Sequence, residues 1–437
     1  MVKSMNVKKQ LIMFISLIIL AVIMPVVSAQ TDENVSLEAM SALLVDAENG
    51  QILFEKEADL AVNSGAATKL LLVYLVYEAI AAGKLTLDAP VPISDAVYQL
   101  SQNYEIANIP LRQDFQYTVE ELLQAVAVKS ANGAALALVE ATSSSQQDFL
   151  GKMKQKLTEW HLEGNQLTNI LGISTDDNGS QNTSTGNKLT AKTIATIAYR
   201  LINDFPEYLE YTKIERLHFK AETSDALVVE NSNDLLDSSM KPDGLMLTNA
   251  EDGYHHQILT VRRNNRRLLA VVLGEPDEAV RTYKGVKQLM DYGFTAFNKQ
   301  NVLIKDTLTN QIPAVDVVGG KKKVVSTVYT EDVSLTLPSE WSNIKYLYEF
   351  VPDKKHINEK NQIEAPIKKN TTIGTVKVSL ERAEIPFLPT AKGTAVPIKT
   401  SESVEKAGWI RRALQGAQHI GEGIVDGTRK FFIDLFN

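Results

Sequence analysis

The order of the predicted elements over residues 36–297 restricts the fold more than any other feature of the sequence. The segment opens with two apolar runs, 42–46 and 52–54, which flank Asn49-Gly50 and predict a β-hairpin. A helical middle follows, and strand-like runs return at the end. A hairpin, a helical middle and returning strands describe an α/β (α+β) domain in which helices flank one sheet.

The helical middle contains four predicted helices. The apolar helix 69–82 is followed by one that begins at Thr118, where Thr118 and Glu121 form a capping-box pattern. Helices over 132–141 and 190–202 complete the set. The returning strands are expected over 245–248, 257–262 and 268–273.

Four arginines lie between the last two strands and surround Asn264-Asn265: Arg262, Arg263, Arg266 and Arg267. We interpret this cluster as a hairpin tip. The net charge of the chain is −8. Because nucleic-acid binding relies on basic surfaces, we expect no nucleic-acid partner.

Beyond residue 298 the pattern changes to short alternating apolar runs, which predict an all-β domain over residues 300–388. The runs are 302–304, 315–318, 324–328, 333–337 and 373–380. A polar, proline-containing stretch over 389–403 predicts a linker after this domain.

The first 29 residues have the pattern of a secretory signal peptide. Lys3, Lys8 and Lys9 precede an apolar run over 11–27, and small residues lead to a cleavage site after Ala29. Cleavage would remove three lysines and no acidic residue, which takes the net charge from −8 to −11. We expect an exported protein. The apolar run is also long enough for an uncleaved anchor helix, which is the alternative.

Residues 404–437 predict an amphipathic helix. Apolar residues recur at helical spacing from Ile410 to Leu435, next to Trp409 and the basic pair Arg411-Arg412. Helices with aromatic residues and a basic face bind the membrane interface, so we expect a membrane anchor. Docking of the helix on the protein's own surface is the alternative.

The chain has no cysteine, and its six histidines show no metal-ligand spacing. Disulfides, a thiolate nucleophile and cysteine-ligated metals are therefore excluded. We expect neither a metal site nor a cofactor. An exported chain of this size without disulfides must rely on a substantial hydrophobic core.

Several stretches, taken in order, resemble the low-molecular-weight penicillin-binding proteins, the serine-type D-alanyl-D-alanine carboxypeptidases. Residues 42–56 are similar to the opening hairpin of that family. The sequence Ala66-Ala67-Thr68-Lys69 stands where the family has Ser-x-x-Lys, and Ser130-Ala131-Asn132 stands at its Ser-x-Asn. Asp243-Gly244-Leu245 matches the lead-in to its Lys-Thr-Gly.

The resemblance implies a penicillin-binding-protein/β-lactamase-like transpeptidase domain over 36–297, followed by the small all-β domain and the C-terminal amphipathic helix. In that family the serine of the first motif attacks the peptide carbonyl, and the lysine accepts its proton. The serine of Ser-x-Asn relays a proton, and the asparagine holds the substrate amide. The Lys-Thr-Gly strand binds the substrate carboxylate and lines the oxyanion site.

Transferred residue by residue, this scheme makes Lys69 and Ser130 remnants of the catalytic set and Asn132 a substrate-binding residue. Two motifs depart from the family. The nucleophile position is Ala66, and Met246, Leu247 and Thr248 replace Lys-Thr-Gly.

The nearby hydroxyls are poor substitutes for the missing nucleophile. Ser64 lies five residues before Lys69, so the two would be about 140° apart around a helix. Thr68 is adjacent to Lys69 and would point away from it. We expect Lys69 to hydrogen-bond Ser130 and Asn132 across the cleft, which gives the surviving residues a structural role. Residual catalysis is the alternative.

Our main hypothesis is a catalytically inactive member of the family. It would be exported to the outer face of the cytoplasmic membrane of a bacterial envelope, where it binds peptidoglycan stem peptides or cell-wall enzymes. The alternative is an active serine-type carboxypeptidase that trims stem pentapeptides with Ser64 or Ser130 as nucleophile, so activity is left open. A third interpretation is a structural protein whose β domain spaces the first domain above the membrane.

Overall fold

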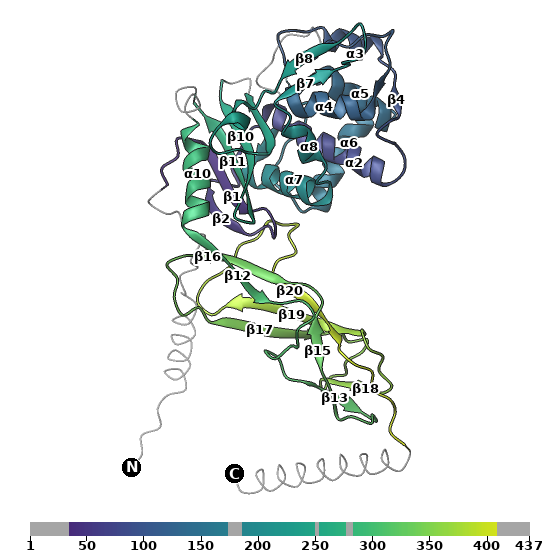
Figure 1. Cartoon of the computed structure of the whole chain (residues 1–437), viewed down its shortest axis with the longest axis vertical. Coiled ribbons are helices and arrows are strands. Elements are labelled where there is room, and N and C mark those ends of the chain that lie inside the picture. Colours follow the sequence, from purple (N-terminus) through teal and green to yellow (C-terminus); the bar gives the residue numbers. More distant parts are fainter. Residues whose placement is uncertain (1–34, 174–185, 250–252, 277–282, 409–437) are drawn as a thin grey trace, which may run out of the picture.

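The computed structural model describes residues 35–173, 186–249, 253–276 and 283–408. Figure 1 shows a body of helices and strands, and beneath it a narrower body of strands. The predicted signal peptide (1–29) and nearly all of the predicted anchor (404–437) lie outside the described residues. Among the residues that are described, no helix is long and apolar enough to cross a membrane.

The first body is organised around one five-stranded antiparallel sheet, and the expected α/β (α+β) class is confirmed. In sheet order the strands are β2 (Ile52–Lys56), β1 (Ser41–Asp46), β11 (Arg266–Glu275), β10 (His255–Arg263) and β9 (Gly244–Asn249). The pairing of β1 with β11 runs from Ser41 opposite Leu273 to Asp46 opposite Leu268. The N-terminal hairpin is therefore completed by strands from the other end of the domain.

Side-chain alternation along β1 divides the core between the two faces of the sheet. Leu43 belongs to the core formed with α2 (Lys69–Ala81) and α7 (Ala191–Asp204). Leu44 packs on the opposite face with α10 (Lys284–Thr295). All six residues of β1 are buried, as a strand covered on both faces requires.

The helices form a second layer around α2. The other helices of this body are α3 (Asp95–Ser101), α4 (Val119–Lys129), α5 (Asn132–Thr142), α6 (Gln146–Glu159) and α8 (Tyr208–Thr212). Every residue of α2 from Lys69 to Tyr77 is buried, because an apolar helix of this kind has to be surrounded by other elements. The predicted capping box is confirmed: the Thr118 hydroxyl accepts from the Glu121 amide, and the Glu121 carboxylate accepts from the Thr118 amide.

Short elements connect these layers. They are β3 (Ala61–Asn63) paired with β6 (Lys188–Thr190), β4 (Pro90–Val91) with β5 (Tyr117–Thr118), β7 (Arg216–Phe219) with β8 (Leu227–Glu230), and the 3₁₀ turns η1 (Gly65–Thr68) and η3 (Asp234–Asp237).

The arginine cluster lies at a hairpin tip, as predicted. Asn264 and Asn265 form the turn between β10 and β11 with φ values of 48° and 59°, the conformation for which asparagine is favoured in two-residue hairpins. Arg267 forms an ion pair with Asp243, and Arg266 donates to two backbone carbonyls. These two arginines therefore tie the hairpin to the residue before β9 and to the end of α10 and the start of β12 (Phe297–Leu303).

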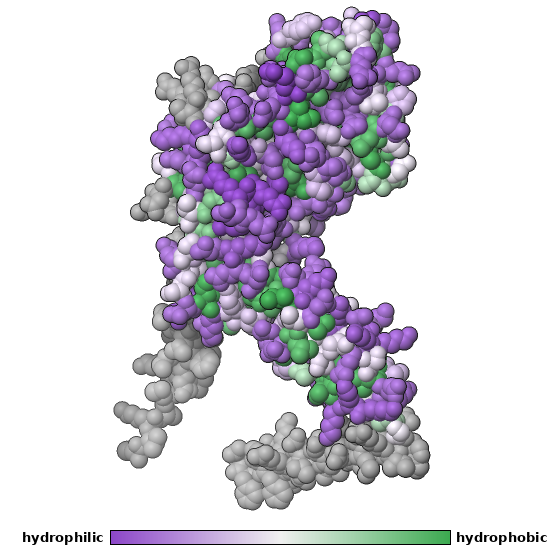
Figure 2. Space-filling view, viewed as in Figure 1, coloured by the Kyte–Doolittle hydropathy of each residue, from purple (hydrophilic) through white to green (hydrophobic). Residues whose placement is uncertain are grey.

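The second body consists of strands throughout its described length. They are β12 (Phe297–Leu303), β13 (Val315–Val318), β14 (Val324–Val325), β15 (Thr327–Tyr329), β16 (Val333–Pro338), β17 (Tyr346–Pro352), β18 (Gln362–Glu364), β19 (Thr372–Leu380) and β20 (Ala395–Thr400). β12 pairs with β16, and the other strands form the sheets β14-β13-β18 and β15-β20-β19-β17. Figure 2 shows a largely hydrophilic face on which apolar residues form small separate patches.

The predicted linker over 389–403 is wrong in the structure. Residues Ala395–Thr400 form β20, which lies between β15 and β19. Val396 and Ile398 alternate inward into the core of the β domain. One of the two prolines of the predicted linker, Pro397, lies in this strand, opposite Thr375 of β19. The alternating apolar pattern of residues 395–400 is short, and the polar composition on both sides of it favoured the prediction of a linker.

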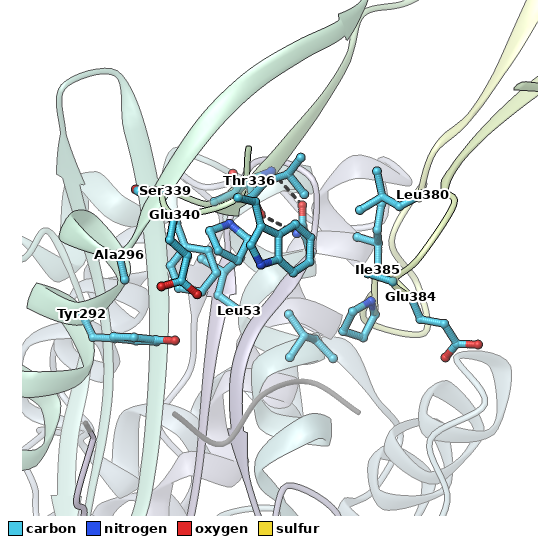
Figure 3. Close-up of a pocket in the computed structure, with 17 residues that line it drawn as sticks. Leu53, Tyr292, Ala296, Thr336, Ser339, Glu340, Leu380, Glu384 and Ile385 are labelled. Carbon is cyan, nitrogen blue, oxygen red and sulfur yellow. Dashed lines mark hydrogen bonds between the residues drawn. The ribbon is translucent and has the colours of Figure 1, made fainter. Parts of the chain in front are cut away.

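The two bodies are joined by a buried polar contact between the β1–β2 hairpin and β16. The Thr336 hydroxyl donates to the carboxylate of Asp46, which is 1% exposed. The Gln51 amide group both donates to the Thr336 carbonyl (2.6 Å) and accepts from the Thr336 amide (2.9 Å). Figure 3 shows Thr336 beside a small apolar pocket at this junction, with Leu53 and Tyr292 on its walls.

We predict that Thr336→Val lowers the free energy of unfolding by about 1.5–3 kcal/mol, because a buried carboxylate loses a charge-assisted hydrogen bond. The matched control is Thr394→Val, whose buried hydroxyl donates to the neutral carbonyl of Val378 within the β domain. The control should lose about 1 kcal/mol. Urea unfolding of both variants measures the difference, and equal losses would contradict a special role for the junction contact.

Candidate functional site

A cleft of about 760 Å³ in the first body lies between β9 and the helices α4 and α5. It brings together most of the residues that the sequence singled out: Ala66, Lys69, Ser130, Asn132, Leu247 and Thr248. Met246 lies just behind, in a space of about 10 Å³ that it lines together with Lys69 and Ser130. The three motifs, two of which are degenerate, therefore meet at one place, although they are far apart in the sequence.

Ala66 presents a methyl group where the family has its nucleophile. It lies in η1, immediately before α2, and is half-buried at the wall of the cleft. Lys69 follows one turn later as the first residue of α2. The geometry of the first motif is thus preserved, while the hydroxyl that would be acylated is missing.

Ser64 is fully buried and its hydroxyl is already engaged. It donates to the carbonyl of Asn187 (3.2 Å) and lies 3.1 Å from the hydroxyl of Thr68. Thr68 in turn accepts from the Asn187 side chain at 3.0 Å. Ser64 does not line the cleft. Both hydroxyls therefore belong to a buried network beneath η1.

Lys69 is 1% exposed, and burial lowers the pKa of its amine to about 7. Within the described part of the chain, the acceptor of its Nζ is the carbonyl of Leu171, at 3.0 Å. The amine is therefore desolvated without a carboxylate to compensate. At neutral pH a substantial fraction of it is uncharged.

Ser130 and Asn132 both line the cleft, on the wall formed by α4 and α5. Among the described residues, Ser130 Oγ and Asn132 Oδ1 are buried without a hydrogen-bond partner. Asn132 is oriented through its Nδ2, which donates to the carbonyl of Ala107 at 3.0 Å. Ser130 ends α4 with a φ of 54°. The expected hydrogen bonds from Lys69 to Ser130 and Asn132 are absent here, and that prediction is wrong because the amine turns to Leu171.

The degenerate strand motif lies on β9, an edge strand of the sheet, where it pairs with β10. Met246 belongs to the core on the helical face, and Leu247 packs with the core of the opposite face. Successive side chains of a strand point to opposite faces of the sheet, which explains why Met246 and Leu247 belong to different cores. Met246 and Leu247 both line the small space that Lys69 and Ser130 also line, and Leu247 and Thr248 border the open cleft.

Sequence reasoning missed the groups that hold these residues in place. Asn187 is fully buried and its carbonyl Oδ1 accepts from the amides of Thr168 and Asn169, which shapes the loop that carries Leu171. The acceptors at Leu171 and Ala107 are backbone carbonyls, and because every residue has one, the sequence does not reveal which carbonyl will accept. Only Asn187, a polar residue directly before a predicted helix region, could have been suspected.

Two other features of the described structure are weaker candidates for a site. The junction pocket holds about 210 Å³, and its buried polar residues, Gln51 and Thr336, are hydrogen-bonded to each other. Across the described ranges, no group of three or more His, Asp or Glu residues could hold a metal ion. The cleft, with its unsatisfied buried atoms, is therefore the candidate site.

Fold and cleft together define a penicillin-binding-protein architecture: a lysine at the start of a buried helix, a Ser-x-Asn turn across the cleft, and a β domain behind the sheet. Comparison with known proteins agrees. The sequence profile of D-alanyl-D-alanine carboxypeptidases matches residues 27–277, and that of the penicillin-binding protein 5 C-terminal domain matches residues 297–406. The chain belongs to the D-alanyl-D-alanine carboxypeptidase family of peptidoglycan metabolism.

Relatives match over most of their length. The chain is 25% identical to the D-alanyl-D-alanine carboxypeptidase DacF of Bacillus subtilis, over 85% of this chain and 87% of that protein. It is 25% identical to DacA of Escherichia coli, over 81% and 82%. A peptidoglycan synthesis regulatory factor (PBP3) from Streptococcus pneumoniae has a similar structure, with a TM-score of 0.71 and 29% identity over 85% of this chain and 100% of that chain.

We predict that the Lys69 amine makes stability pH-dependent. Its pKa is about 7 in the folded protein and close to 10.5 in the unfolded chain, so the unfolded state binds one more proton between these values. Stability of the wild type relative to Lys69→Met should therefore rise above pH 7, by up to about 1.4 kcal/mol per pH unit. Lys84→Met, which removes an exposed lysine after α2, is the control and should show no such rise. Parallel curves for wild type and Lys69→Met between pH 6 and 9 would refute the burial argument.

Proposed function

We propose that this protein is a non-catalytic member of its family that binds peptidoglycan stem peptides in the cleft. One observation carries the proposal: the nucleophile position is Ala66, while the opposite wall keeps two buried polar atoms without partners, Ser130 Oγ and Asn132 Oδ1. Buried polar atoms of this kind normally have partners in the folded protein or in a ligand. The site has lost its reacting group and kept groups that can hold a peptide.

The alternative, an active hydrolase with a different nucleophile, lacks a nucleophile–base pair. A serine becomes reactive when a base is within hydrogen-bonding reach of its hydroxyl. Ser64 is bonded to Asn187 and Thr68 and does not line the cleft. Among the described residues the Ser130 hydroxyl has no partner, and the Lys69 amine donates to Leu171. Neither serine is therefore prepared for attack.

We further propose that the protein acts at the outer face of the cytoplasmic membrane. The signal-peptide pattern over 1–29 and the amphipathic pattern over 404–437 support export and attachment through the C-terminal helix. Its relatives are D-alanyl-D-alanine carboxypeptidases of bacteria, in agreement with a place in the cell envelope. Cell-wall enzymes are the second class of partner that this position would allow.

A purely structural role as a spacer is the remaining candidate. The buried contact between Asp46 and Thr336 joins the two bodies firmly, in agreement with a β domain that supports the first domain. A spacer, however, gives no reason for an open cleft with unsatisfied polar atoms. Loss of function on substitution of Ser130 would therefore separate a binding protein from a spacer.

We predict that a fluorescent penicillin does not label the purified mature wild type, because the loss of a nucleophile lowers such rates by about 10⁶. Ala66→Ser should become labelled, since it places a hydroxyl one turn before Lys69. The labelling rate should rise as pH increases through about 7, where the Lys69 amine loses its proton and becomes a base. A labelled wild type would overturn the proposal, and mapping of the modified serine would decide between Ser64 and Ser130.

We predict that Ser130→Ala weakens binding of soluble stem peptides about 5- to 10-fold, the equivalent of one hydrogen bond of about 1 kcal/mol. Its melting temperature should stay unchanged, because the hydroxyl has no partner among the described residues. The matched control is Ser41→Ala, whose buried hydroxyl donates to the Glu57 carbonyl and does not line the cleft. The control should lower the melting temperature and leave binding intact. Calorimetric titration and thermal melts measure both, and the opposite pattern would argue against peptide binding.

A further inference from the structure

The wall of the cleft formed by β9 carries no positive charge. Met246 lies against Lys69 and Ser130, and Leu247 and Thr248 border the opening. Met246 is 9% exposed, and its thioether is only a weak hydrogen-bond acceptor. The strand therefore offers neither a cation nor a side-chain N–H donor to a ligand that lies along it.

Among the described residues, the other charged groups that line the cleft are of mixed sign. Lys129, half-buried at the end of α4, lines the cleft together with two carboxylates, Glu105 and Asp234. The ring of His256 accepts from the Gly274 amide through Nδ1, which makes it the neutral form. His255 also lines the cleft, at its partly exposed edge.

The amine of Lys69 is also unsuited to a carboxylate. It is directed to the carbonyl of Leu171 at 3.0 Å and is almost completely buried. A carboxylate that lies along β9 would be desolvated against the apolar side chain of Leu247. Burial of a charge without a partner is strongly unfavourable. A free C-terminal carboxylate is therefore not what this end of the cleft is built to receive.

What the cleft does offer suits a peptide amide. Asn132 lines the cleft and is fixed by the bond from its Nδ2 to the Ala107 carbonyl, while its Oδ1 is an acceptor without a partner among the described residues. An acceptor of this kind requires an N–H from the ligand. The Ser130 hydroxyl can donate or accept. An amide group supplies both an N–H and a carbonyl oxygen and carries no charge.

We propose that the cleft recognises wall peptides through their amide groups and accepts a peptide whose C-terminal end is closed as an amide at least as well as one with a free carboxylate. The inference rests on the proposed peptide-binding function and specifies its ligand class. Amide ends arise in two ways, by amidation or by cross-linking to another chain. Both present the same chemistry to Met246.

The test uses three synthetic probes that differ only at the C-terminus of diacetyl-L-lysyl-D-alanyl-D-alanine: the free acid, the carboxamide and the N-methylamide. The protein is the mature wild type, and affinity is measured by calorimetric titration at 20 and 500 mM NaCl. We expect the carboxamide to bind at least as tightly as the acid. The affinity of the acid should change less than about twofold between the two salt concentrations, because no exposed ion pair is screened. An N-methylamide that binds like the carboxamide indicates acceptance of cross-linked ends, and one that fails indicates amidated ends.

The variant Met246→Lys tests the reverse case, in which β9 carries a cation. A lysine there would lie beside Ser130 and could meet a carboxylate with a charge-assisted hydrogen bond. The variant should prefer the acid over the carboxamide by about 10-fold or more. Met246→Leu, which keeps an apolar side chain of similar volume, is the control and should keep the wild-type order of affinities. If Met246→Lys does not fold, the three-probe comparison on the wild type decides the question alone.

The outcomes distinguish failure of this inference from failure of the proposed peptide-binding function. A wild type that prefers the acid by 10-fold or more, with affinity that falls at high salt, overturns the inference and leaves peptide binding in place. A wild type that binds none of the three probes overturns the proposed function, and the inference with it. Comparable or tighter binding of an amide-ended probe supports both.

Discussion

The pairing of β1 with β11 is the constraint on which the rest of the structure depends. β1 lies between β2 and β11 and is buried on both faces, so the hairpin at the start of the domain needs the strands at its end to complete its hydrogen bonds. All the helices between them are then held as one layer against the sheet. The cleft forms where that layer meets β9, and it therefore exists only once both ends of the domain have come together.

Within that frame the site has kept its positions and changed its chemistry. Lys69 still begins α2 beneath the cleft, yet its neighbours are a methyl group at Ala66 and a thioether at Met246. A buried amine that meets only a carbonyl is destabilising when charged, and the lowered pKa of Lys69 expresses this. The unsatisfied atoms of Ser130 and Asn132 are costly in the same way. Their retention is understandable if a ligand satisfies them, and a purely structural site would be expected to lack them.

The β domain depends on the same sheet. Asp46 at the end of β1 and Gln51 before β2 reach across to Thr336, so the strand pair that organises the first body also fixes the second. β20 closes the β domain with the last described strand of the chain. The described strands of the β domain form their own sheets, and these contacts hold them to the sheet of the first body.

The sequence by itself determined the class of fold, the starts of the four predicted helices and the degenerate motifs. Alternation at 42–46, the capping box at Thr118 and Ala66 at the nucleophile position are all local patterns of side chains. Tertiary structure decided the rest. It placed the proline-containing segment 395–400 in a sheet, directed Lys69 to Leu171 in place of Ser130, and set Met246 and Leu247 on opposite faces. The reason is physical: a side-chain pattern reports which side of an element is buried, whereas the backbone carbonyl or distant strand that comes to lie against it is set only when the chain has folded.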